Sequence, residues 1–191
     1  MKKTRLIIIA IVLILGLWLT SKYNGLVRGD ESVKTAWSQV ENVYQRRADL
    51  IPNLVNTVKW AAAQEQNVLT AVVEARANAT RANIDIKDVD ALADYQKAQG
   101  ELSTALWRLL MITENYPELK SIEAFRDLTV QLEGTENRIS VERMNYNTAV
   151  RSFNIMLRSF PTNIVAKLFG FEKANLFEAE EWAEVAPEVQ F

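Results

Sequence analysis

Apolar residues recur at intervals of three and four positions through most of the chain after Val33. This spacing places them on one face of an α-helix, and its average of about 3.5 residues is typical of a helical-bundle seam. Three such stripes are present, over residues 33–79, 95–116 and 122–160. No segment alternates apolar and polar residues with a period of two, so the pattern predicts an all-α domain.

The first stripe is too long to pair evenly with the other two. As one helix it would reach about 75 Å, against about 40 Å for the second stripe. Pro52 lies near its middle, and Asp49 is placed to cap a helix that begins there. We therefore predict an antiparallel up-and-down four-helix bundle within residues 26–161, with long, coiled-coil-like helices at 30–48, 50–82, 88–116 and 120–160. The unbroken phase of the stripe across Pro52 leaves one kinked helix as the alternative.

The N-terminus has a different pattern. A continuous apolar run from Leu6 to Leu19 follows three basic residues, Lys2, Lys3 and Arg5. The residues after the run lack the pair of small side chains that signal peptidase requires, which favours a retained membrane anchor over residues 1–25. The run is shorter than the ~20 residues of a typical span, but its basic flanks can reach the membrane surface. The positive-inside rule places Met1 in the cytoplasm, so we predict a single-pass protein of the cell membrane whose bulk is exocytoplasmic, on the periplasmic side.

Four charged residues occupy stripe positions at which an apolar side chain is expected: Arg47, Glu65, Glu136 and Arg143. An unpaired charge in a helical core costs several kcal/mol, so these side chains are expected to find partners. The simplest interpretation is that they fix helix register, as polar residues do in coiled-coil seams. Two alternatives remain. These residues line a binding groove, or they belong to the polar face of a helix whose apolar face is wrongly assigned.

The composition excludes most catalytic chemistry. The chain has no histidine and no cysteine, so it cannot form Ser-His-Asp or Cys-His arrangements or the zinc and di-iron sites that use those ligands. Its six glycines stand apart and form no phosphate-binding loop. A net charge of -2 does not favour nucleic acid as a partner. We predict a protein without catalytic activity, cofactor or metal, and an enzyme built on carboxylates alone is the remaining catalytic alternative.

The tail over residues 162–191 combines apolar, aromatic and acidic residues. An aromatic cluster of this density either packs back on the end of the bundle or binds a partner. Candidate interface residues are Phe169, Phe171, Phe177, Trp182 and Phe191. The final segment, which ends on Phe191, also has a shape suited to strand addition in a PDZ-like groove.

Six segments form an ordered set along the chain: Tyr23–Val27, Trp37–Glu41, Gln45–Val55, Leu132–Ile139, Tyr146–Asn147 and Arg158–Pro161. Together they resemble the bacterial LemA family over nearly the whole chain. The resemblance implies a membrane anchor followed by an antiparallel four-helix bundle, and it favours the break near Pro52. It implies no established enzyme activity. Members of this family are often encoded beside membrane proteases or TPM-domain proteins, which are therefore expected partners.

The resemblance marks two signature segments, Arg46–Leu54 and Glu133–Ile139. The first and fourth helices of the predicted bundle are antiparallel, so we hypothesise that Arg47 contacts Glu136. Candidate interaction or register residues are Arg46, Arg47, Asp49, Pro52, Asn53, Glu133, Glu136, Asn137, Arg138 and Arg143. We predict a non-enzymatic scaffold or adaptor for a membrane or envelope partner. A self-assembling structural envelope protein, and hence a homo-oligomer, remains the alternative.

Overall fold

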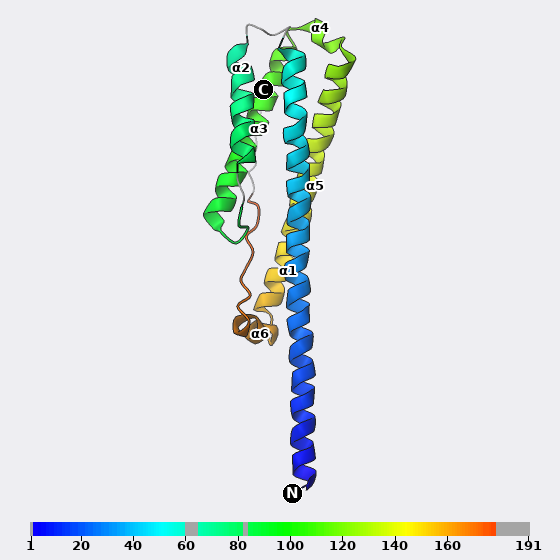
Figure 1. Cartoon of the computed structure of the whole chain (residues 1–191), viewed down its shortest axis with the longest axis vertical. Helices are drawn as coiled ribbons and strands as arrows, with labels where there is room; N and C mark the ends of the chain where they lie inside the picture. The colour runs from blue at the N-terminus through cyan, green and yellow to red at the C-terminus, as the bar shows by residue number, and fades with distance from the viewer. Residues whose placement is uncertain (1, 60–64, 82–83, 179–191) are drawn as a thin grey trace, which may run out of the picture.

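The computed structural model describes residues 2–59, 65–81 and 84–178. Within these ranges all regular structure is helical, which confirms the all-α part of the prediction (Figure 1). The helices are α1 (Lys2–Val58), α2 (Gln66–Thr80), α3 (Val89–Thr113), α4 (Pro117–Lys120), α5 (Glu123–Arg158) and α6 (Thr162–Leu168).

The predicted break near Pro52 is wrong, because α1 continues through this residue to Val58. Proline has no backbone N–H, so the carbonyl oxygen of Ala48, four residues earlier, loses its usual donor in the helix. Arg76 of α2 supplies a replacement, since its Nε donates to the Ala48 oxygen at 2.7 Å. The chain instead leaves the helix after Val58, and the predicted helix at 50–82 is divided between the end of α1 and all of α2.

Replacing Arg76 by methionine is expected to lower the free energy of unfolding by about 1–3 kcal/mol, because the buried Ala48 carbonyl would lose this donor. Denaturant unfolding of the full chain in detergent, followed by circular dichroism, measures this change. The same substitution in a Pro52→Ala background provides the control, since alanine restores an N–H to the helix. An equal penalty in both backgrounds would show that Arg76 does not act by filling the gap at Pro52.

The long helices pack chiefly as two pairs, α1 with α5 and α2 with α3, and α2 also contacts α1. The α1–α5 pair is antiparallel: Gly29 of α1 lies against Phe153 of α5, whereas Arg47 lies against Glu136. A Cβ atom at Gly29 would stand 2.8 Å from the Phe153 ring, so the close approach of these helices requires glycine there. Figure 1 shows α2 and α3 beside this pair and α4 at the end far from the N-terminus.

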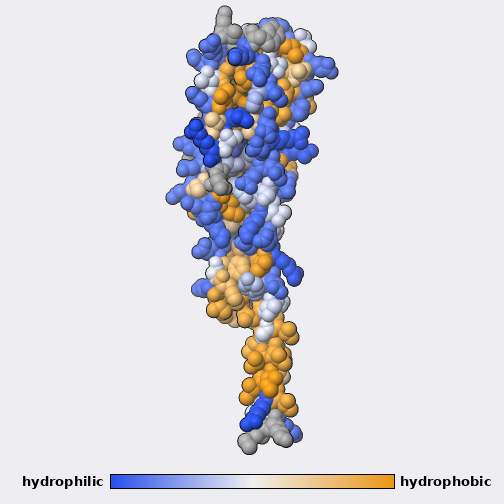
Figure 2. All heavy atoms as spheres, viewed as in Figure 1, coloured by the Kyte–Doolittle hydropathy of each residue, from blue (hydrophilic) through white to orange (hydrophobic). Residues whose placement is uncertain are grey.

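The N-terminal part of α1 extends beyond the rest of the protein. Its apolar side chains from Leu6 to Leu17 are exposed, and Figure 2 shows them as a continuous hydrophobic rod. By length and composition this helix is able to cross a membrane, and none of its apolar window is buried by the protein. The same α-helix then enters the packed domain without interruption.

Two hydrophobic clusters fill the space between the helices, one on each side of Arg47. The cluster nearer α6 includes Trp37, Tyr44, Tyr95, Tyr146, Phe153 and Phe177. The cluster nearer α4 includes Ile51, Leu54, Leu102, Leu109, Phe125 and Leu132. α1 passes from the first to the second between Tyr44 and Ile51, so Arg47 lies at the boundary between the two cores.

After α6 the chain runs back along α5, where two asparagines of that helix hold it. Asn154 donates to the carbonyl oxygen of Ala174 at 2.9 Å and accepts from its N–H at 3.2 Å. Asn147 makes the same pair of bonds with Phe177, at 3.1 and 2.8 Å. Two helical turns separate the asparagines by about 10.5 Å, and three extended residues cover about 10 Å. The matched spacing lets α5 bind the tail backbone at two points.

Candidate functional site

Arg47 of α1 is the most buried charged side chain among the described residues, with 1% of its surface exposed. Its Nη1 donates to Glu136 Oε1 at 2.9 Å and to Ser103 Oγ at 2.7 Å. Its Nη2 donates to the backbone oxygen of Gln99 at 3.3 Å and to the side-chain oxygen of the same residue. The contact between Arg47 and Glu136 that the sequence suggested is therefore present.

This network reaches all four long helices. Gln99 of α3 donates its Nε2 to the carbonyl oxygen of Ala79 in α2 at 3.1 Å, while Ser103 belongs to α3 and Glu136 to α5. A polar layer between two apolar cores penalises any shift of one helix, because a shifted helix would leave buried donors and acceptors unpaired. The network can therefore fix the register of the four helices relative to one another.

Aromatic rings enclose Arg47 on the side of the first cluster. The guanidinium carbon lies 5.1 Å from the centroid of the Tyr44 ring, and this ring meets Tyr95 edge-on at 5.5 Å. Burial raises the pKa of Tyr95 well above its ordinary value, so the phenol stays neutral throughout the physiological range. Arg47 thus has neutral aromatic rings on this side and its ion-pair partner is Glu136, whose side chain is 39% exposed.

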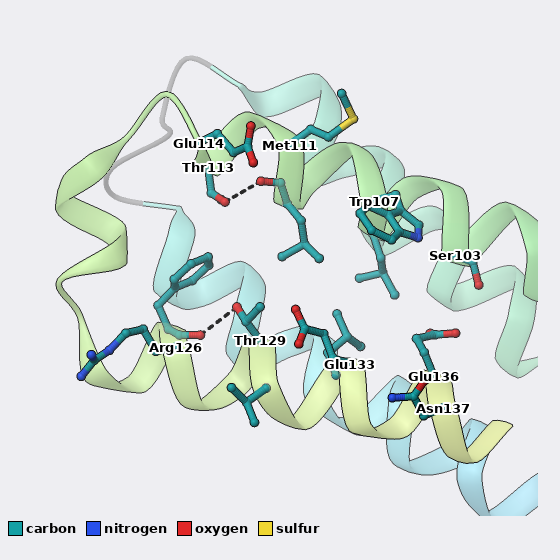
Figure 3. A pocket seen from close by; sticks show the side chains of 15 residues that line it. Ser103, Trp107, Met111, Thr113, Glu114, Arg126, Thr129, Glu133, Glu136 and Asn137 are labelled. Atoms are coloured by element: carbon teal, nitrogen blue, oxygen red, sulfur yellow. Dashed lines mark hydrogen bonds between the residues drawn. The ribbon is translucent and has the colours of Figure 1, made fainter. Parts of the chain in front are cut away.

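An open groove between α3 and α5 begins at this polar layer and extends toward α4 (Figure 3). Its volume is about 870 Å³, and Ser103 and Glu136, both bonded to Arg47, line one end. The floor is apolar, formed by the buried side chains Leu106, Phe125 and Leu132. The exposed apolar walls are Trp107 and Met111 from α3 and Val130 from α5.

Charged groups surround the apolar floor of this groove unevenly. The carboxylates of Glu114 and Glu133 stand against the guanidinium of Arg126, whereas the carboxylate of Glu136 is paired with Arg47. Figure 3 shows Trp107 on the α3 wall and Glu133 on the α5 wall across from it. The groove is thus suited to an apolar group with basic neighbours. In the described part of the chain, no three Asp or Glu side chains are placed to hold a metal ion.

Comparison with known proteins identifies the family. The LemA family profile matches residues 36–191, which include the polar layer and the groove. The chain belongs to the LemA family. The resemblance seen in the sequence is confirmed. The two segments that this resemblance marked as signatures contain Arg47 and Glu136, which form the ion pair.

Curated relatives of this LemA-family chain include magnetosome proteins. MamQ 2 of Paramagnetospirillum magneticum strain AMB-1 is 27% identical over 179 residues, which cover 84% of this chain and 66% of the relative. MamQ of Magnetospirillum gryphiswaldense is 25% identical over 178 residues, with 83% and 65% covered. Protein LemA of Metamycoplasma hominis is 22% identical over 159 residues, with 83% and 69% covered. The chain therefore spans just under two thirds of the length of these MamQ proteins, and none of the relatives bears the name of an enzyme.

The structure separates the predicted LemA site residues into two groups. Glu133, Glu136 and Asn137 line the groove, and Arg47 donates a hydrogen bond to Glu136 at its inner end. The other candidate residues of these two segments are exposed: Arg46, Asp49, Pro52, Asn53 and Arg138. Asp49 does not cap a helix, because its carboxylate accepts a hydrogen bond from Gln45 within α1 at 2.8 Å.

Two other charged stripe residues lie elsewhere. Glu65 stands at the N-cap position of α2 and not within a helical stripe. Arg143 of α5 is half-buried, and its guanidinium carbon lies 4.9 Å from the centroid of the Phe177 ring. It also donates to the carbonyl oxygen of Glu178 at 3.3 Å, so it contacts the tail and is remote from the polar layer along α5.

The predicted tail residues also divide. Phe177 is buried among Trp37, Tyr146 and Arg143, whereas Phe169 and Phe171 contact Tyr23 of α1. Trp182 and Phe191 lie outside the described residues.

Sequence reasoning missed Gln99, Ser103 and Arg76. The apolar spacing within residues 95–116 runs from Tyr95 through Ala98 to Leu102. In the structure, the buried residue between Tyr95 and Leu102 is Gln99. A glutamine between two large buried residues was the available signal for a polar partner. No local signal pointed to Arg76, because its acceptor lies 28 residues away in another helix.

Proposed function

We propose that this LemA-family protein is a membrane-anchored scaffold that binds a segment of a partner protein in the groove between α3 and α5. The single observation that carries the proposal is the groove itself, which has an apolar floor and about 870 Å³ of open space. Pockets of this kind bind ligands mainly by burying apolar groups, and a few polar groups set the orientation. The proposal concerns binding alone and assigns no catalytic role to a side chain of the groove.

The anchor is the N-terminal part of α1. Its exposed apolar run and its continuity with the packed domain support a helix that crosses the membrane once and carries the domain on its far side. By the positive-inside rule, the basic residues before the run support a topology with Met1 in the cytoplasm and the groove outside it.

The two helix pairs then function as one up-and-down four-helix bundle. The polar layer around Arg47 supports this arrangement, because it joins side chains or backbone of α1, α2, α3 and α5 in one hydrogen-bonded set. A rigid bundle would hold the two walls of the groove at a constant spacing.

The partner's chemistry follows from the groove. With Glu136 paired to Arg47, the carboxylates of Glu114 and Glu133 and the guanidinium of Arg126 around an apolar floor favour a segment with large apolar side chains next to lysine or arginine. Since the domain is tethered to a membrane, the partner is a protein of the same membrane or its surface. A membrane protease or a TPM-domain protein is the expectation that the family suggests.

Substitutions in the groove test this proposal. The double variant Met111→Ala, Val130→Ala is expected to lower recovery of a crosslinked partner from gently solubilised membranes by about tenfold or more, as for loss of an interface hot spot. Both side chains are exposed, at 64% and 67%, so the free energy of unfolding should change by less than about 0.5 kcal/mol.

Met144→Ala with Ile155→Ala is the matched control, because these residues are exposed at 61% and 66% on α5 outside the groove. Full recovery of the partner with the groove variant would reject the groove as the binding site. Self-assembly would instead be supported if the wild-type chain is recovered as a discrete oligomer without a second protein and the groove variant abolishes that oligomer.

A further inference from the structure

The short helix α6 has apolar residues on two opposite sides. Thr162, Val165 and Ala166 are buried against the domain. Phe160, Ile164 and Leu168, at intervals of four residues, are exposed at 82%, 58% and 69%. Ile164 and Leu168 are four residues apart in α6 and therefore share one of its faces, whereas Phe160 precedes the helix. We call these three exposed residues the apolar stripe, which the protein itself does not cover.

This stripe lies at the point where the apolar run of α1 ends. The ring of Phe169, which follows α6, is 4.8 Å from the ring of Tyr23, and the Phe171 ring is 5.8 Å from it. Tyr23 is only about 6 Å along the helix from Leu19, the last residue of the run. Figure 2 shows the hydrophobic surface of the rod continuing onto this corner of the domain.

The charges around the stripe fit a membrane surface. The segment 158–173 contains three basic residues and one acidic residue: Arg158, Lys167, Lys173 and Glu172. Apolar residues flanked by lysine and arginine are typical of segments that lie in the lipid headgroup region. Tyrosine, as at position 23, is enriched at the same depth.

We propose that Phe160, Ile164, Leu168 and Phe169 form a second contact with the bilayer that α1 crosses, inserting into its headgroup region beside the anchor. This inference rests on the proposed membrane anchor. Two contacts with one bilayer would restrict tilting of the domain, which a single helix cannot do. With α1 upright, Arg47 and the inner end of the groove would stand about 36 Å above Tyr23.

Single spin labels test the proposal, because the chain has no native cysteine. The full-length variants Leu168→Cys and Ile164→Cys are labelled with a nitroxide and reconstituted in vesicles of phosphatidylethanolamine and phosphatidylglycerol. Collision rates with oxygen and with a water-soluble nickel chelate are then compared. Leu13→Cys reports the anchor, and Val141→Cys, on an exposed site of α5, reports water.

The oxygen-to-nickel ratio at Leu168 and Ile164 is expected to exceed that at Val141 severalfold and to remain below that at Leu13. An aqueous ratio at both α6 sites with a high ratio at Leu13 would overturn this inference and leave the anchor intact. An aqueous ratio at Leu13 would reject the anchor, and with it this proposal. If the α6 labels are shielded from both reagents and show spin–spin broadening, the stripe contacts a second copy of the chain and not lipid, which would also overturn this inference.

Discussion

Replacing Arg47 by methionine is expected to lower the free energy of unfolding by about 3 kcal/mol, the lower end of the range for breaking a buried ion pair. Glu136 is 39% exposed and can turn toward water, which limits the penalty. Gln99 is buried and cannot turn toward water, so its side-chain and backbone oxygens would both lose the donor that Arg47 supplies. Denaturant unfolding of the full chain in detergent measures the difference.

Arg46→Met is the matched control, since Arg46 is the adjacent arginine and is exposed. It should change the free energy of unfolding by less than about 0.5 kcal/mol. Equal effects of the two substitutions would reject the polar layer as a stabilising element. Loss of the partner with stability retained in Arg47→Met would assign Arg47 to binding instead.

A charge swap of Arg47 and Glu136 does not test their ion pair alone. Position 47 also faces Gln99 and Ser103, which accept hydrogen bonds from the arginine. A glutamate there would place a carboxylate against a backbone carbonyl oxygen and could not donate to it. We therefore expect the swapped double variant to remain less stable than the wild type.

Replacing Phe177 by alanine is the second change for which we expect a large effect, also about 3 kcal/mol. The ring is buried and lies 5.8 Å from Trp37 and 5.3 Å from Tyr146 between ring centroids. Its loss leaves a cavity where α1 and α5 meet the tail. The tail lies at the surface and can partly close that cavity, so we take the lower end of the range for such truncations.

Asparagine variants separate the ring's contribution from that of the backbone bonds. Asn147→Ala and Asn154→Ala each remove a pair of bonds to the tail and should speed hydrogen exchange at the amides of Phe177 and Ala174. Asn145→Ala is the control, because Asn145 is an exposed residue of α5 that bonds Glu142 of the same helix. Unchanged exchange in the first two variants would show that packing alone holds the tail.

Much of the architecture was predictable because its causes are local. The stripes of α1, α3 and α5 identify helices, since the 3.6-residue turn places residues three and four apart on one face. The apolar run before Thr20 stands out by composition alone. The lack of histidine and cysteine limits the available chemistry regardless of the fold.

The incorrect or missed predictions concern positions at which a side chain of one helix forms a hydrogen bond with another helix. Proline normally interrupts the hydrogen bonds of a helix, but at Pro52 the missing bond is replaced by a side chain from α2. The same holds for Gln99, whose role depends on the register of α3 against α1. A sequence pattern reports which face of a helix is apolar and does not report which residue stands opposite.

The sequence by itself thus determined the helical class, the apolar N-terminal segment and the need of Arg47 for a partner. Only the tertiary structure decided that the partner is Glu136 with Gln99 and Ser103, that α1 passes Pro52, and that α3 and α5 leave a groove between them. The physical reason is the range of the interactions. Helical periodicity arises from neighbours three and four residues apart, whereas the bond from Arg47 to Glu136 joins residues 89 apart, and forms only when all the helices have their final register.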